Sequence, residues 1–365
     1  MKKQLLFVLF TLILISACMS SQGVTSTPYL IPTHTSSVQS TDAQFVSYWP
    51  TNGWRTSSPE EQGMDSTLLA QMFETIDEQE LDIHSVLVIR KGYIVAEKYL
   101  PPFTENTRHE LFSCTKSFIS ALIGIAIDDG YIHDVNQTVL DFFPQRTFAN
   151  LDERKESMTL EDLLMMRSGL DWEEGMPIYQ EMQATRDWLG FVLNKPMAVE
   201  PGNKFNYCSG CSHLLSAIIQ KTTGMNTLEY AQNRLFDPLN ISNIHWELDG
   251  SGIPNGGWGL EMTPRDMAKF GYLFLNEGSW DGQQIVPSEW VRVSTQAGLE
   301  TGEGVDYAYQ WWVYPTSNLF AAQGINGQRI YVIPSLELVV VLTADMENTT
   351  PITELVEDWI ILAVH

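Results

Sequence analysis

The sequence predicts an α+β fold in which an antiparallel β-sheet is flanked by helices and an all-helical region is inserted between its strands. β-rich runs cluster at about 49–134 and 296–365 of the 365 residues, whereas about 135–295 holds mainly short helical patterns separated by Gly and Pro. Strands near both chain ends can bury their apolar faces together in one sheet with helices packed on it. We therefore expect one folded domain over residues 49–365.

The first seventeen residues have the composition of an export signal. Lys2 and Lys3 precede an apolar run from Leu5 to Ile15, and small residues stand directly before Cys18. The run is too short to cross a bilayer of about 30 Å as a permanent helix. Its end resembles a bacterial lipobox, which implies that residues 1–17 are a lipoprotein signal peptide and that Cys18 is lipidated. We expect an exported protein, lipid-anchored at the cell envelope; simple cleavage with Cys18 unmodified is the alternative.

Residues 18–48 predict a flexible tether, because they are rich in Ser, Thr and Gln and poor in large apolar side chains. Across the chain, 45 acidic residues outnumber 21 basic ones and give a formal net charge of −24 at pH 7. Such a surface repels nucleic acid and anionic lipid headgroups. Nucleic-acid binding is therefore disfavoured, and attachment to a membrane depends on the lipid rather than on polybasic attraction.

Local patterns place the elements along the folded domain. Periodicity, β-branched runs and helix caps predict a helix at Ser66–Glu78, strands at Ser85–Arg90 and Tyr93–Tyr99, a helix at Phe112–Asp129, helix starts at Thr159 and Thr263, strands at Tyr309–Tyr314, Arg329–Ile333 and Leu338–Thr343, and a last helix at Thr350–Val364. Lys91-Gly92 supplies the first hairpin turn, and Gly130 favours the left-handed conformation that ends a helix. Ser113 therefore lies at or near a helix N-terminus.

Ser113-Cys114-Thr115-Lys116 carries the candidate nucleophile. Side chains three residues apart on a helix lie on one face, so the Lys116 amine can reach the Ser113 hydroxyl. A serine hydroxyl is a weak nucleophile near neutral pH unless a neighbouring group takes its proton, and a buried amine with a lowered pKa can do so. Because Ser and Lys are common, the spacing alone is a weak signal. The alternative is a surface lysine one turn after an N-cap serine.

Longer segments give this spacing its context. In chain order they are His109-Glu-Leu-Phe-Ser-Cys-Thr-Lys-Ser-Phe, Leu160-Glu-Asp-Leu-Leu-Met-Met-Arg-Ser-Gly-Leu-Asp-Trp, Pro201-Gly-Asn-Lys-Phe-Asn-Tyr, Gly256-Gly-Trp-Gly-Leu-Glu-Met-Thr-Pro-Arg-Asp-Met-Ala-Lys-Phe-Gly and Gly327-Gln-Arg-Ile-Tyr-Val. They resemble the serine β-lactamase and penicillin-binding-protein superfamily, and within it the class C-type branch. The resemblance runs from about Trp54 to the C-terminus and implies the β-lactamase/DD-peptidase-like fold, in agreement with the strand layout.

The resemblance implies roles for further residues. Tyr207, in Tyr207-Cys208-Ser209, matches a tyrosine that shuttles a proton between the serine and the lysine, which a phenol can do if a cation lowers its pKa. Ala322-Gln323-Gly324-Ile325 matches a strand that presents backbone groups to the substrate, so the backbone N–H groups of Ser113 and Ile325 would form the oxyanion hole. Ser209 and Gly324, from these elements, are the implied substrate-binding residues. Trp258, in a Gly-rich loop, is a further candidate for the cleft wall, with a place in the core as the alternative. Whether Lys116 or Tyr207 is the general base stays open.

One departure from the family pattern bears on the substrate. A lysine that often meets a substrate carboxylate is replaced by Ala322, which removes a charge-assisted contact expected for β-lactams and peptidoglycan termini. The segment looks closest to the subgroup of carboxylesterases and 6-aminohexanoate-dimer hydrolase. It implies a serine hydrolase acting through an acyl-enzyme on an ester, a short linear amide or a peptide. The alternatives are a penicillin-interacting DD-carboxypeptidase or class C-like β-lactamase, and a non-catalytic lipoprotein that binds a small ligand.

No cofactor or metal is predicted. Cys208-Ser-Gly-Cys211 has the spacing of a redox or zinc half-site, but no second cysteine pair or His-x-His cluster completes a metal shell. With Cys18 assigned to the anchor, at most one intramolecular bridge can form among Cys114, Cys208 and Cys211. His109 and His213 are interpreted as structural. The Trp311-Trp312 pair could line the cleft or belong to the core, which is more common for aromatic residues.

Overall fold

The computed structural model describes residues 48–296, 298–301 and 304–365. The predicted signal peptide (1–17), the lipidation site Cys18 and, except for Tyr48, the predicted tether (18–48) lie outside the described residues. Among the helices that are described, none is both long and apolar enough to cross a bilayer.

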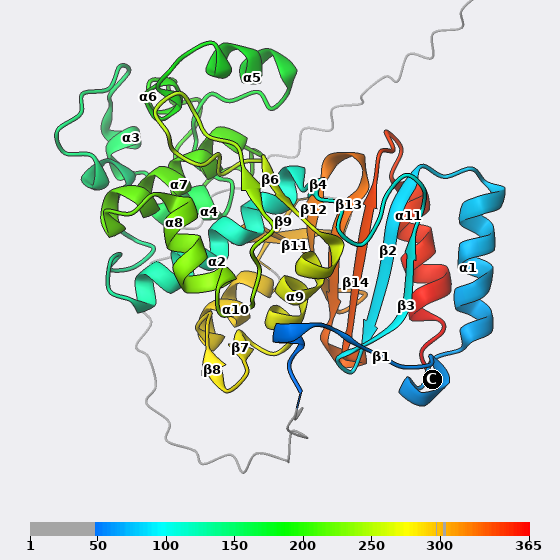
Figure 1. The fold of residues 1–365 in the computed structure, drawn as a ribbon. Coiled ribbons are helices and arrows are strands. Elements are labelled where there is room, and N and C mark those ends of the chain that lie inside the picture. Colours follow the sequence, from blue (N-terminus) through cyan, green and yellow to red (C-terminus); the bar gives the residue numbers. More distant parts are fainter. Residues whose placement is uncertain (1–47, 297, 302–303) are drawn as a thin grey trace, which may run out of the picture. The chain divides into compact units, whose positions relative to one another are not determined.

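A nine-stranded sheet forms the centre of the described domain (Figure 1). Its order is β1-β3-β2-β14-β13-β12-β11-β10-β9, so that strands from the two chain ends meet where β2 pairs with β14. The predicted antiparallel sheet is confirmed, apart from the short edge strand β1, which runs parallel to β3. The strands are β1 (Arg55–Thr56), β2 (Ile83–Arg90), β3 (Tyr93–Tyr99), β9 (Leu299–Glu300), β10 (Asp306–Ala308), β11 (Trp311–Tyr314), β12 (Leu319–Gly324), β13 (Gln328–Ile333) and β14 (Leu338–Ala344).

Alternate residues of the central strands face two separate cores, as the period of two of a β-strand requires. Val86 and Val88 of β2 belong to the core beneath α1 and the C-terminal helix, whereas Leu87 and Ile89 belong to the core beneath α2 and α9. Figure 1 shows α1 and α11 on one side of the sheet and α2 and α9 on the other. These covering helices are α1 (Ser66–Glu78), α2 (Thr115–Asp128), α9 (Pro264–Leu275), α10 (Ser288–Thr295), α11 (Thr350–Glu354) and the π-helical η8 (Leu355–Ile361).

The inserted region is less purely helical than its composition predicts. β6 pairs with both β4 and β5 in a three-stranded sheet, β7 and β8 form a hairpin, and α9 packs on β13 and β14 of the main sheet. Strands of two or three residues are too short to leave a period-two pattern in the sequence. The remaining elements are β4 (His109–Glu110), η4 (Val139–Phe142), α3 (Glu153–Ser157), α4 (Leu160–Leu164), α5 (Met176–Gln183), α6 (Trp188–Leu193), α7 (Ser209–Thr223), α8 (Thr227–Ala231), the π-helical η5 (Gln232–Phe236), β5 (His245–Trp246), β6 (Leu260–Met262), β7 (Ser279–Trp280) and β8 (Gln283–Gln284).

Capping signals place the helix starts as predicted. Thr159 and Asp162 form a capping box at the start of α4, because each side chain accepts a backbone N–H of the other. Thr263 caps α9, and Pro264 occupies its first turn. The 3₁₀ turns are η1 (Pro50–Asn52), η2 (Glu60–Gln62), η3 (Phe112–Cys114), η6 (Ile325–Gly327) and η7 (Pro334–Leu336). One predicted helix is interrupted, since the segment expected as a helix from Phe112 begins with η3 and becomes α-helical only at Thr115.

Candidate active site

Ser113 lies in the 3₁₀ turn η3, between the short strand β4 and helix α2. The residue before it, Phe112, has a φ of +46°, which is uncommon for a residue with a side chain. Such backbone strain costs about 1–3 kcal/mol and is concentrated at functional sites. The turn is fixed at its start, because the backbone N–H of Leu111 donates to the carbonyl of Leu260 at 2.8 Å. The sharp turn lets the Ser113 side chain face a cleft while α2 itself is buried.

Lys116 is fully buried on the first turn of α2 and points at Ser113. Its Nζ donates to Ser113 Oγ at 2.8 Å and to the carbonyl oxygen of Gly257 at 2.7 Å. Burial lowers the pKa of the Lys116 amine to about 8, although the negative charge of Glu174 acts in the opposite direction. The amine is therefore hydrogen-bonded to the hydroxyl and partly neutral near pH 8, as a proton acceptor requires.

Tyr207 lies beside Lys116, whose Nζ is 4.9 Å from the centroid of the tyrosine ring. Burial raises the pKa of the phenol well above its usual range, although a hydrogen bond with Ser113 acts in the opposite direction. The sequence interpretation required a cation to lower the pKa of this phenol, whereas in the structure burial raises it. The ring also stacks on Trp312 of β11, with 5.9 Å between centroids and 20° between planes. Tyr207 is thus a fixed, protonated phenol beside the nucleophile.

The end of β12 passes very close to the turn that carries Ser113. A Cβ placed on Gly324 would lie 2.3 Å from the carbonyl oxygen of Leu111, so only glycine fits there. In the described residues, neither the backbone N–H of Ser113 nor that of Ile325 donates to another backbone or side-chain group. Buried or cleft-facing N–H groups normally have partners. These two free donors belong to adjoining segments that both line the cleft, and they have the character of an oxyanion hole.

The cleft in front of Ser113 has a volume of about 550 Å³, within the range of small-molecule sites. Ala322 is fully buried in the core, so no side chain reaches the cleft from that position. Of the tryptophan pair, Trp312 lines the cleft and Trp311 is fully buried in the core. The lining residues are Ser113, Tyr207, Trp312, Gln323, Gly324, Ile325, Asn326, Arg329, Glu347 and Thr349.

Two predicted substrate-binding residues lie behind this cleft rather than on its wall. Ser209 is buried, and both its backbone N–H (3.0 Å) and its hydroxyl donate to the carboxylate of Glu174. Trp258 is half-buried and packs on Tyr179, with ring centroids 4.8 Å apart, and on Trp188. Both residues support elements of the site. Gly324, the third predicted residue, does line the cleft.

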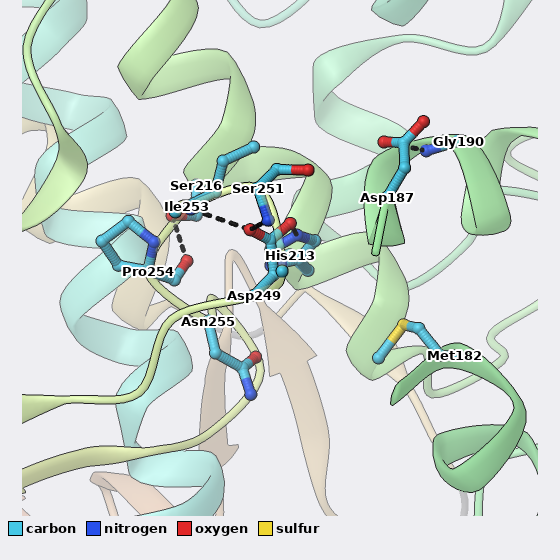
Figure 2. Close-up of polar contacts among 12 residues, drawn as sticks. Met182, Asp187, Gly190, His213, Ser216, Asp249, Ser251, Ile253, Pro254 and Asn255 are labelled. Carbon is cyan, nitrogen blue, oxygen red and sulfur yellow. Dashed lines mark hydrogen bonds and ion pairs between the residues drawn. The ribbon is translucent and has the colours of Figure 1, made fainter. Parts of the chain in front are cut away.

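A loop from Asp249 to Trp258 carries the Gly257 carbonyl that accepts from Lys116, and helix α7 holds this loop (Figure 2). The buried carboxylate of Asp249 accepts from the backbone N–H groups of Ser251 and Ile253, each at 2.8 Å, and contacts His213 Nε2 at 3.2 Å. Burial tends to raise the pKa of Asp249, but the hydrogen bonds from His213 and the loop backbone hold it below its usual value. His213 thus anchors the loop that fixes Lys116.

One helical turn further along α7, the same loop is held again. Ser216 Oγ donates to the carbonyl of Pro254 at 2.6 Å, and Asn255 Oδ1 accepts the backbone N–H of Gly257 at 2.9 Å. Figure 2 shows Ser216 joined to Pro254, with His213 beside Asp249 of the same loop. The structural role expected for His213 therefore includes support of the site.

The cysteines separate into a bridged pair and a buried thiol. Cys208 and Cys211 form a disulfide in the first turn of α7, directly after Tyr207. This bridge commits both thiols, so they are not available to a metal. Cys114 is buried, and burial raises the pKa of its thiol to about 12. Within the described ranges, no group of three His, Cys, Asp or Glu side chains is arranged to hold a metal ion.

His109 takes part in a separate cluster. Its ring contacts His84 and Phe103, with centroids 5.3 and 5.2 Å away, and burial lowers its pKa to about 4. It is not among the residues that line the cleft.

Three contributors to the site were not assigned from the sequence: the Gly257 carbonyl, Glu174 and Arg329. Gly257 and Arg329 lie inside segments that carry the family resemblance, and this resemblance is the signal that could have identified them.

Comparisons with known proteins show what the chain is similar to. The family model described as Beta-lactamase matches residues 69–364. The chain is 26% identical over 302 residues to 6-aminohexanoate-dimer hydrolase from Paenarthrobacter ureafaciens, covering 76% of this chain and 75% of that protein. A penicillin-binding protein structure from Bacillus halodurans gives a TM-score of 0.66 at 15% identity, covering 79% of this chain and 99% of that one. The structure of EstCE1, a hydrolase with promiscuous acyltransferase activity, gives a TM-score of 0.65 at 17% identity. The match covers 79% of this chain and 95% of that one.

The His213–Asp249 contact predicts a measurable stability cost. His213→Ala leaves the buried Asp249 carboxylate with one partner fewer and an unfilled space beside it. We expect the free energy of unfolding, measured by urea denaturation, to fall by about 2–4 kcal/mol. His133→Ala is the matched control, because it removes a solvent-exposed pair with Asp134 and should cost no more than about 1 kcal/mol. Equal losses in the two variants would contradict the anchoring role of His213.

Proposed function

Because the chain belongs to the Beta-lactamase family, we propose that it is a serine hydrolase that forms an acyl-enzyme on Ser113 with an ester or a short linear amide. The observation that carries the proposal is the 2.8 Å hydrogen bond between Lys116 Nζ and Ser113 Oγ, made by a buried amine whose pKa is lowered to about 8. A serine beside a neutral amine has its proton acceptor in place before the substrate arrives. The surrounding free N–H groups supply the second requirement, stabilisation of developing negative charge.

Acylation follows from these positions. The neutral Lys116 amine takes the Ser113 proton while Oγ forms a bond to the substrate carbonyl carbon. The negative charge that develops on the carbonyl oxygen is stabilised by the backbone N–H groups of Ser113 and Ile325. Tyr207, which stays protonated because its pKa is raised, donates a hydrogen bond to the leaving-group atom. That atom takes the proton held by Lys116 as its bond to the acyl carbon breaks.

Deacylation repeats the same steps with water. A water molecule gives its proton to the neutral Lys116 amine and attacks the acyl carbon. When the tetrahedral intermediate collapses, Ser113 Oγ leaves and recovers the proton from Lys116. The products are a carboxylic acid and the alcohol or amine released earlier, and the enzyme is regenerated without a cofactor in any step.

Ser113→Ala tests the proposal directly. We expect hydrolysis of p-nitrophenyl butyrate to fall by at least about a thousandfold, because the variant has no nucleophile. Ser120→Ala, on the next turn of α2, is the matched control, since the Ser120 hydroxyl is buried without a partner in the described part of the chain. It should retain most of the activity. Intact-mass analysis should also find a fluorophosphonate adduct on the wild type and not on Ser113→Ala; a retained rate in Ser113→Ala would contradict the proposal.

The lowered pKa of Lys116 predicts the pH dependence. The amine must be neutral to accept a proton, so kcat/KM should rise with pH, reach half its plateau near the pKa of about 8, and fall about tenfold per pH unit below it. Tyr207→Phe should lower the rate and leave this midpoint in place, because the pKa of that phenol is raised far from it. A midpoint that disappears in Tyr207→Phe would assign the base to the tyrosine instead.

The substrate class is supported by the cleft wall. Ala322 provides no cation for a substrate carboxylate, and the arginine on the cleft wall, Arg329, already donates to Gly324, Gln328 and Thr349. Tyr207, Trp312 and Ile325 offer apolar surface beside Ser113. The curated relative is a hydrolase of 6-aminohexanoate dimer, and EstCE1 is a hydrolase with acyltransferase activity. We expect kcat/KM for short-chain esters to exceed that for a chromogenic cephalosporin by about ten- to a hundredfold, since a lost charge-assisted contact costs about 1.5–3 kcal/mol. Comparable rates would restore the β-lactamase alternative.

A further inference from the structure

Arg329 is a buried cation on the cleft wall that the mechanism above does not use. It lies on β13, opposite Gln323 of β12, and is only 7% exposed. It lines the same cleft as Ser113. Among the described residues, no carboxylate oxygen lies within 4.0 Å of its guanidinium nitrogens. A buried guanidinium without an ion pair is expensive to maintain, so its hydrogen bonds identify what it does.

Three of its side-chain hydrogen bonds go to segments that border the cleft, and a further one goes to the phenol of Tyr331 on its own strand. Nη1 donates to the carbonyl oxygen of Gly324 and, at 2.9 Å, to that of Gln328. Nη2 donates to Thr349 Oγ1 at 3.1 Å, at the start of α11. The guanidinium therefore ties together the end of β12, the start of β13 and the start of α11.

The bond to Gly324 fixes one particular peptide group. The carbonyl of Gly324 and the N–H of Ile325 belong to the same trans peptide, and in a planar trans peptide these two bonds point in opposite directions. Holding the carbonyl toward Arg329 therefore turns the Ile325 N–H away from it. That N–H is the free donor described above, in the segment that adjoins the Ser113 turn. A charged donor on the carbonyl also polarises the peptide and strengthens its N–H as a donor.

The backbone on either side of this peptide has little stiffness of its own. Gly324 has no side chain to restrict its ψ, Asn326 has a φ of +59° and Gly327 a φ of +100°. The Ile325 side chain is 63% exposed and gives little packing support. Rotation of the Gly324–Ile325 peptide would remove the donor from the cleft. The pairing of Gly324 with Gln328 restrains the peptide from the strand side, and Arg329 adds a charged donor to the same carbonyl.

We propose that Arg329 is a positioning residue of the oxyanion hole: it clamps the Gly324 carbonyl so that the Ile325 N–H faces the substrate carbonyl oxygen. The proposal rests on the proposed function, since it presumes that Ser113 forms a tetrahedral intermediate. Loss of one oxyanion donor costs about 10²–10³ in kcat, and loss of its orientation alone should cost a part of this.

Arg329→Ala and Arg329→Lys test the clamp with a neutral ester as substrate. We expect kcat to fall by about ten- to a hundredfold with KM changed less than about threefold, because the N–H acts mainly on the transition state. Guanidinium ion added to Arg329→Ala should restore part of kcat, and lysine should restore little because a single ammonium cannot reach three separated acceptors. The affinity for phenylboronic acid, which forms a tetrahedral adduct with serine, should fall by a similar factor.

Arg90→Ala is the matched control. Arg90 is also buried, and its guanidinium donates to the carbonyl of Leu336, but it pairs with Leu338 at the opposite end of β14 from the cleft. Its loss should lower stability and leave kcat and boronate affinity unchanged. A purely structural role of Arg329 would give the same result as Arg90.

The outcomes separate this inference from the proposed function. If the wild type hydrolyses the ester, Ser113→Ala does not, and Arg329→Ala keeps its kcat and boronate affinity, the clamp is wrong and the hydrolase stands. If only the KM of an ester carrying a carboxylate rises in Arg329→Ala, the residue binds a substrate carboxylate and the clamp is again wrong. If the wild type is inactive, boronate affinity in Arg329→Lys still reports the oxyanion hole, and an unchanged value overturns the clamp. Should Arg329→Ala not fold, Arg329→Lys carries the same comparisons.

Discussion

The site depends on one buried amine held between two oxygens. Lys116 Nζ reaches Ser113 Oγ on its own helix and the Gly257 carbonyl from a loop far away in the sequence. An amine taken out of water loses hydration, so its position is set by the acceptors that replace it. Those acceptors must in turn be fixed, and much of the surrounding structure serves this purpose: the strained turn at Phe112 on one side and the loop before Trp258 on the other.

Helix α7 makes this arrangement possible, because it carries or contacts most groups around the amine. Tyr207 lies directly before its first turn, and His213 and Ser216 hold the loop that carries Gly257. The loop can approach α7 closely because residue 256 is a glycine: a Cβ on Gly256 would lie 2.1 Å from the carbonyl oxygen of Ser212. The Cys208–Cys211 bridge closes the first turn of the same helix. A displacement of α7 would therefore move the phenol and the second lysine acceptor together.

Glu174 extends this network to the outer helices. Its carboxylate accepts from Trp172 Nε1 at 2.5 Å and from Ser209, and so ties the segment after α4 to the start of α7. Its charge opposes the effect of burial on the pKa of Lys116. The carboxylate thus links the position of the helical region to the basicity of the amine. A fully bonded polar network of this kind gives a defined geometry at the cost of desolvating its members.

The sequence predicts what is encoded locally. Helix α1 and the hairpin of β2 and β3 follow from periodicity and turn residues, and Lys116 follows from its spacing from Ser113. Tyr207 and Ile325 required the family resemblance, because no local pattern relates positions so far apart. Phe112 could not be predicted to adopt a positive φ, since its identity favours the opposite sign. The Gly257 carbonyl escapes prediction for another reason: every residue has a carbonyl, and only tertiary structure decides which one Lys116 meets.

Two cations border Ser113, and their chemistry explains why one is a lysine and the other an arginine. Both donate to backbone carbonyls, Lys116 to Gly257 and Arg329 to Gly324. Proton transfer needs a group that can lose its charge, and burial lowers the pKa of a lysine amine far enough for that. Orientation of a peptide needs a group that keeps its charge and bonds several acceptors in fixed directions, which the guanidinium does at any physiological pH. Exchange of the two residues would leave the cleft charge unchanged and would remove both functions.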